Sequence, residues 1–155
     1  MRSLIFLLGL QACIIVPLPM PVPTMSQAPV RALAATAAPN TRFDAQLNAA
    51  RSQPISYNAQ LAAVAQKHAA DMQARSYLSH ATPEGTRAKN RAAAAGLPSC
   101  GIGENIAQGQ KTSDDVFTAW MNSGGHRRNM LNPRMASYGI GQAGDYWVLM
   151  LYTPC

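Results

Sequence analysis

The chain has 155 residues, 48% of them hydrophobic, and a formal net charge of +6 at pH 7. This length suits one domain and leaves little room for two. The charge permits loose attraction to anionic surfaces, but Arg127–Arg128 is the single adjacent basic pair, so the sequence does not indicate nucleic-acid binding.

The N-terminus has the pattern of an export signal. Arg2 precedes a short apolar run at 4–10, and prolines interrupt the sequence from Pro17 onward. A transmembrane helix needs about 20 apolar residues, so this run is too short to be a good one. We therefore expect a protein that is secreted or periplasmic and, once processed, is not an integral membrane protein.

Two ways of processing this N-terminus are open. Small residues at positions 32 and 34 predict cleavage after Ala34, which makes 1–34 a signal peptide and 35–40 a disordered lead-in to a domain over 41–155. The competing interpretation takes Cys13 as the lipidated residue of an anchored lipoprotein.

The number of cysteines in an exported chain predicts a disulfide. If Cys13 leaves with the signal, Cys100 and Cys155 remain, and an even count in an exported chain favours a disulfide. The alternative is a pair of free thiols.

Two helices open the domain. Apolar residues at helical spacing predict the first helix over 41–52, and Pro54 ends it. Asn58 can cap a second helix that ends near Ser76. Its apolar stripe contains Leu61, Val64, Ala65, His68 and Met72, so we interpret His68 as a packed residue rather than a ligand.

Turn chemistry marks the middle of the chain. Pro83, Glu84 and Gly85 predict a turn within a loop over 79–86. An alanine-rich helix over 86–95 follows and stops at Gly96. A short strand is predicted over 104–107.

The last third is expected to change from helices to strands. Thr112 or Ser113 can cap a helix that Gly124–Gly125 breaks, and a short turn or helix follows over 126–131. Two strands over 138–142 and 146–152, joined by a turn at 143–145, finish the chain. Helices first and paired strands last indicate an α+β fold with helices packed on a mainly antiparallel sheet.

Four short motifs resemble those of a known family. They are YLSH at 77–80, GENI at 103–106, WMNSGGHR at 120–127 and YGIG at 138–141. In this order and spacing they resemble the CAP superfamily of cysteine-rich secretory, antigen-five and pathogenesis-related proteins, specifically its short bacterial secreted branch. The resemblance covers about 41–155 and implies an α-β-α sandwich.

The same resemblance implies a cleft where two histidines and two acidic residues meet. Carried over by motif, His80 and His126 are the histidines and Glu104 is the first acid. Ser123 stands where the family's eukaryotic pattern has its second acid, so a mechanism that needs two carboxylates is weakened.

Such a cluster has three chemical uses. Two imidazoles and a carboxylate can bind a divalent metal such as zinc, perform acid–base chemistry, or form a hydrogen-bond network. No serine lies in a nucleophile-elbow sequence, so we assign no catalytic residue and favour a non-enzymatic domain that binds a metal, small molecule, lipid or cell-surface ligand. The alternatives are an extracellular hydrolase of peptides, cell-wall material or esters, and a passive envelope structural protein.

Overall fold

The structure is a computed structural model that describes residues 40–155. The expected signal peptide, its cleavage after Ala34 and the alternative lipidation of Cys13 fall outside the described residues. Within the described part of the chain, no helix is both long enough and apolar enough to span a membrane.

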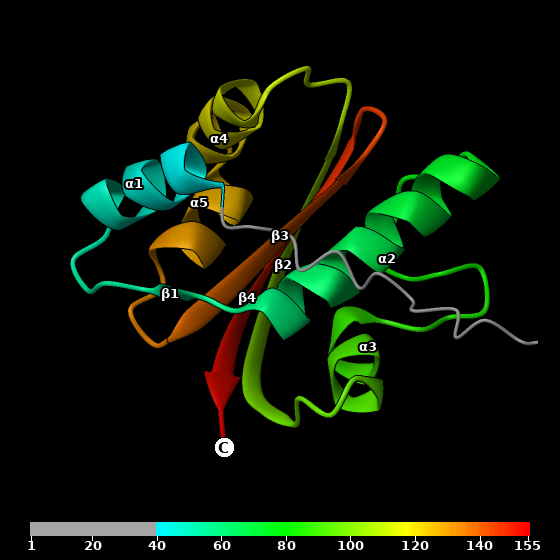
Figure 1. The fold of residues 1–155 in the computed structure, drawn as a ribbon, viewed down its shortest axis with the longest axis horizontal. Coiled ribbons are helices and arrows are strands. Elements are labelled where there is room, and N and C mark those ends of the chain that lie inside the picture. The colour runs from blue at the N-terminus through cyan, green and yellow to red at the C-terminus, as the bar shows by residue number, and fades with distance from the viewer. Residues whose placement is uncertain (1–39) are drawn as a thin grey trace, which may run out of the picture. The chain divides into compact units, whose positions relative to one another are not determined.

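Helices cover both faces of one four-stranded sheet (Figure 1). The first half holds α1 (Thr41–Ala50), β1 (Ser56–Tyr57), α2 (Ala59–Arg75), α3 (Ala88–Ala94) and β2 (Ser99–Gln108). The second half holds α4 (Ser113–Asn122), α5 (Gly124–Leu131), β3 (Ser137–Ala143) and β4 (Tyr146–Pro154). Helices α1, α4 and α5 lie on one face of the sheet, and α2 and α3 lie on the other. The expected α+β sandwich of three layers is confirmed.

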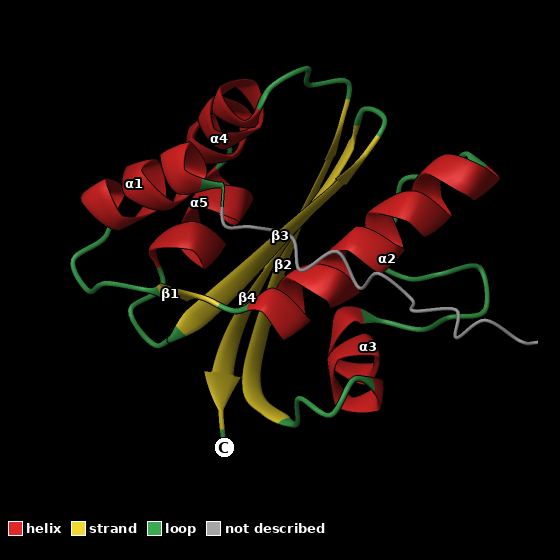
Figure 2. Ribbon diagram, viewed as in Figure 1, coloured by secondary structure: helices red, strands yellow, loops and turns green. Residues whose placement is uncertain are grey.

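The sheet has the order β1-β3-β4-β2 (Figure 2). Strand β4 pairs antiparallel with both β2 and β3, as expected for a mainly antiparallel sheet. The short β1 adds a parallel edge beside β3. The sequence did not predict β1, because two residues are too few to show an alternating pattern.

Strand β4 separates two hydrophobic cores. Because successive side chains of a strand point to opposite faces, Trp147, Leu149 and Leu151 pack with α1, α4 and α5. Val148 and Met150, from the same strand, pack with α2 and α3. Both faces of the strand are buried, which is why its sequence is apolar without interruption.

Several predicted boundaries differ from the observed ones. The first helix ends at Ala50 rather than 52, and α3 begins at Ala88 rather than 86. Strand β2 starts at Ser99, not at 104, because it pairs with nearly the whole of β4. The glycine pair does not separate the next two helices: α4 ends at Asn122, Ser123 caps it, and Gly124 is the first residue of α5.

The backbone of α2 lies directly on β3. A Cβ atom added at Gly139 would lie 2.1 Å from the amide nitrogen of Ala62, and one at Gly141 would lie 2.2 Å from that of Gln66. Both distances are far shorter than a van der Waals contact. These two glycines therefore set how closely α2 approaches the sheet.

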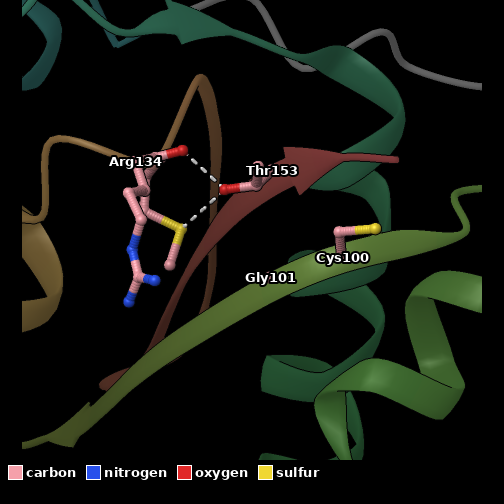
Figure 3. A pocket seen from close by; sticks show the side chains of 5 residues that line it. Cys100, Gly101, Arg134 and Thr153 are labelled. Atoms are coloured by element: carbon pink, nitrogen blue, oxygen red, sulfur yellow. Dashed lines mark hydrogen bonds between the residues drawn. The ribbon is translucent and has the colours of Figure 1, made fainter.

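The predicted disulfide is present. Cys100 on β2 and Cys155 at the end of the chain are bonded, with a sequence separation of 55. Cys100 also lines a cavity of about 270 Å³. The hydroxyl of Thr153, which lines the same cavity, donates a hydrogen bond of 2.6 Å to the carbonyl of Arg134 (Figure 3). The disulfide ties Cys155, the last residue, to β2, which is an edge strand of the sheet.

Reduction of this disulfide is expected to lower the free energy of unfolding by about 2–4 kcal/mol, because the oxidised unfolded chain is restricted by a long loop. Urea unfolding with and without a reductant measures the difference. The control is Cys100→Ser, whose stability is expected to be the same in both conditions. Equal stability of the oxidised and reduced wild-type protein would contradict a stabilising disulfide.

Candidate functional site

His80 lies in the loop between α2 and α3. A tight turn shapes this loop: the amide of Gly85 donates to the carbonyl of Thr82 at 2.7 Å, and Gly85 has a φ of 84°. A bridge between Ala81 and Arg87 closes the base of the loop. The turn predicted from the sequence is therefore confirmed, and it presents His80 with half of its side chain exposed.

Glu104 lies on β2, and its side chain is only 4% exposed. One carboxylate oxygen, Oε1, accepts a hydrogen bond of 2.8 Å from Nδ1 of His80. The other, Oε2, is paired with the guanidinium of Arg91. Both oxygens are thus engaged by nitrogen donors, as a buried carboxylate requires.

Arg91 is the functional residue that the sequence did not reveal. It lies on α3 with its side chain 10% exposed, and besides Glu104 it donates to the carbonyls of Thr86 at 2.7 Å and His80 at 3.3 Å. It therefore connects the His80 loop to β2. One signal in the sequence was available, because Arg91 is three residues after Ala88 and shares a helix face with it.

His126 lies on α5, which is fixed to β2 by asparagine side chains. Asn105 is fully buried and donates to the carbonyl of His126 at 3.1 Å. Asn129 donates to the side chain of Asn105 at 2.9 Å and to the carbonyl of Glu104 at 3.3 Å. These bonds fix the position of His126 relative to the strand that carries Glu104.

The two predicted site histidines interact electrostatically. Burial lowers the pKa of His126, and the positive charge of His80 lowers that pKa further. The structure thus joins His80 directly to Glu104 and places His126 close enough to His80 for their charges to interact. Ser123 lies at the junction of α4 and α5, and within residues 40–155 no hydrogen bond joins its hydroxyl to the other three side chains.

The donor set fits a metal ion only in part. Among the described residues, no three His, Cys, Asp or Glu side chains group closely enough to hold one. Glu104 is unsuited as a ligand because Arg91 and His80 already occupy its oxygens. The candidate metal ligands are therefore the imidazoles of His80 and His126. Glu104 supports His80 by accepting a hydrogen bond from its Nδ1.

His80 and Glu104 also line a cavity of about 250 Å³. Its other walls are Arg87, Ala88, Lys89 and Ile102.

In the part of the chain described here, no side-chain hydroxyl or thiol group is hydrogen-bonded to a histidine ring. Ser79 accepts a hydrogen bond from the amide of Ala81, and Cys100 is held in the disulfide.

Comparisons with known proteins identify the family of this chain. Residues 30–150 match the family model described as the cysteine-rich secretory protein family, CAP. The uncharacterised protein YkwD of Bacillus subtilis is 36% identical over 96 residues, which cover 61% of this chain and 37% of that protein.

Solved structures show the same fold. An extracellular protein of Bacillus anthracis with an SCP domain matches with a TM-score of 0.70 and 26% identity, covering 73% of this chain and 39% of that chain. An outer surface protein of Borrelia burgdorferi matches with a TM-score of 0.67 at 17% identity, covering 74% of this chain and 92% of that one. The chain thus spans well under half of the two Bacillus proteins, YkwD and the extracellular protein. By the family match over most of its length, the chain belongs to the cysteine-rich secretory protein (CAP) family.

Proposed function

We propose that this protein is a non-enzymatic binding domain outside the cytoplasm, in which His80 and His126 together hold a divalent transition metal such as zinc. The observation that carries the proposal is the hydrogen bond between Nδ1 of His80 and the buried carboxylate of Glu104. A carboxylate accepts only, so Nδ1 carries the proton, and in the neutral form of the ring Nε2 is the lone pair available to a metal.

This arrangement is the one that metal-binding histidines use. A ligating imidazole commonly donates its other ring N–H to a carboxylate, which fixes the tautomer and raises the basicity of the ligating nitrogen. Glu104 supplies that support, and Arg91 holds Glu104 in place. The lowered pKa of His126 favours the neutral form of the second ring, which is the form that binds a metal.

A bound metal would supply a Lewis-acidic centre with open positions for a second ligand. The cavity beside His80 has room for a small group, and Arg87 and Lys89 give it positive charge. A small molecule or cell-surface component with an anionic group therefore fits beside the metal. The disulfide supports a location in an oxidising compartment.

Zinc titration by isothermal calorimetry tests the proposal. We expect binding to the wild-type protein and none to a His80→Ala/His126→Ala double variant. Glu104→Gln is expected to weaken binding about 10- to 100-fold, because supporting residues of metal sites have effects of this size. His68→Gln is the matched control, since the remaining histidine is buried on α2 and should leave zinc binding unchanged. Identical heats for the wild type and the double variant would refute the metal site.

A further inference from the structure

We propose that a second pocket, between α2 and the loop 82–86, binds the hydroxyl groups of a neutral carbohydrate. This pocket has a volume of about 330 Å³, within the lower range of small-molecule sites. His68 and Asp71 of α2 and Arg91 of α3 line it together with Thr82 and Thr86. Its lining does not include His80, Glu104 or His126.

Two of the residues that line the pocket carry buried polar atoms without a protein partner. His68 is 1% exposed, and its Nε2 donates to the carbonyl of Ser79 at 2.9 Å, so Nδ1 of the neutral ring is an acceptor. Among residues 40–155 no donor reaches this Nδ1. Nε of Arg91 is likewise a buried donor without an acceptor, although the terminal nitrogens of the same guanidinium are all bonded.

These two atoms leave one donor and one acceptor to be satisfied. Buried polar groups nearly always have a partner in the protein or in ordered water, and a ligand group that can both accept and donate would serve both atoms. A hydroxyl group is such a group, because its oxygen accepts from an N–H while its proton is donated to a ring nitrogen. A carbohydrate offers several hydroxyls at a fixed spacing.

The charges around the pocket favour a neutral ligand over an anion or a metal ion. Arg75 pairs with Asp71 at 2.6 Å and with Glu84 at 2.5 Å. Arg91 is neutralised by Glu104. Lys67 is the remaining cation of the lining, and it offsets the second carboxylate paired with Arg75. With no net charge, the pocket gains little from binding phosphate or a divalent cation.

NMR of the full chain tests the proposal directly. Glucose, mannose and N-acetylglucosamine are titrated to millimolar concentrations into the ¹⁵N-labelled protein, with inorganic phosphate as the charged comparison. We expect at least one sugar to shift backbone amides near 67–71, 82–86 and 91, while phosphate leaves these amides unmoved. The proposal is overturned if none of the three sugars shifts these amides or if phosphate shifts them as strongly.

Variants separate this pocket from the metal site. His68→Gln and Arg91→Lys, which each remove one unpartnered atom, are expected to weaken sugar binding at least tenfold. Lys111→Gln, at a residue that lines neither this pocket nor the cavity beside His80, should leave sugar binding unchanged. The His80→Ala/His126→Ala protein should lose zinc and keep the sugar shifts, so the two proposals can fail independently. If His68→Gln does not fold, the sugar affinity of Arg91→Lys and the amide shifts of the wild-type protein still test the site. A folded variant of His68 or Arg91 that binds the sugar as tightly as the wild type would contradict it.

Discussion

Replacing Arg91 with methionine is expected to lower the free energy of unfolding by about 3–5 kcal/mol, because the buried carboxylate of Glu104 then loses its charged partner. Glu104 is almost fully buried and depends on Arg91 for one of its two oxygens. The same substitution also removes the bonds from Arg91 to the carbonyls of Thr86 and His80. Urea unfolding followed by circular dichroism measures the loss.

The matched control for Arg91→Met is the double variant Arg91→Met/Glu104→Leu. Replacing a buried ion pair with apolar side chains is often close to neutral, so we expect the double variant to be markedly more stable than Arg91→Met alone. The coupling between the two positions follows from the double-mutant cycle. Additive effects of the two single changes would show that Arg91 does not act through Glu104.

Gly139→Ala is expected to destabilise the protein by about 3 kcal/mol or more, at the upper end of overpacking effects. The added methyl group would lie 2.1 Å from the amide nitrogen of Ala62, and this neighbour is helix backbone that cannot rotate away. The whole of α2 would have to move from β3, and the His80 loop that follows α2 would move with it. Thermal or urea unfolding tests this expectation.

Gly103→Ala is the control for that experiment. Gly103 lies on β2 of the same sheet, but a Cβ there would make ordinary contacts, the nearest at 3.5 Å from Leu151. We expect its stability to change by no more than about 1 kcal/mol in either direction. Equal stability of the Gly139 and Gly103 variants would mean that α2 does not rest on β3 as described.

The sequence located several helix caps and turns correctly because their signals are local. Asn58 caps α2 by accepting from the amide of Leu61 at 2.9 Å, as its position indicated. Thr112 and Asp115 form a reciprocal capping box at the start of α4. Gly96 and Gly144 take positive φ where α3 stops and where the last hairpin turns. Such features depend on a few neighbouring residues and are therefore readable in one chain.

Long-range features could not be read in the same way. The early start of β2 depends on β4, some fifty residues away in sequence, and its glycine-rich segment at 101–103 gives no alternating pattern. The partnership of Arg91 with Glu104 requires α3 to lie against β2. The motifs brought His80, Glu104 and His126 together as a candidate site, but only the fold shows that Glu104 supports His80.

Histidine side-chain NMR tests the central claim, that Glu104 holds His80 ready to bind a ligand, most directly. Long-range ¹H–¹⁵N spectra near neutral pH are expected to show His80 protonated at Nδ1 and His68 protonated at Nε2. Added zinc is expected to shift Nε2 of His80 and the ring of His126 while the His68 signals stay in place. A proton on Nε2 of His80, or zinc that shifts neither His80 nor His126, would contradict the account.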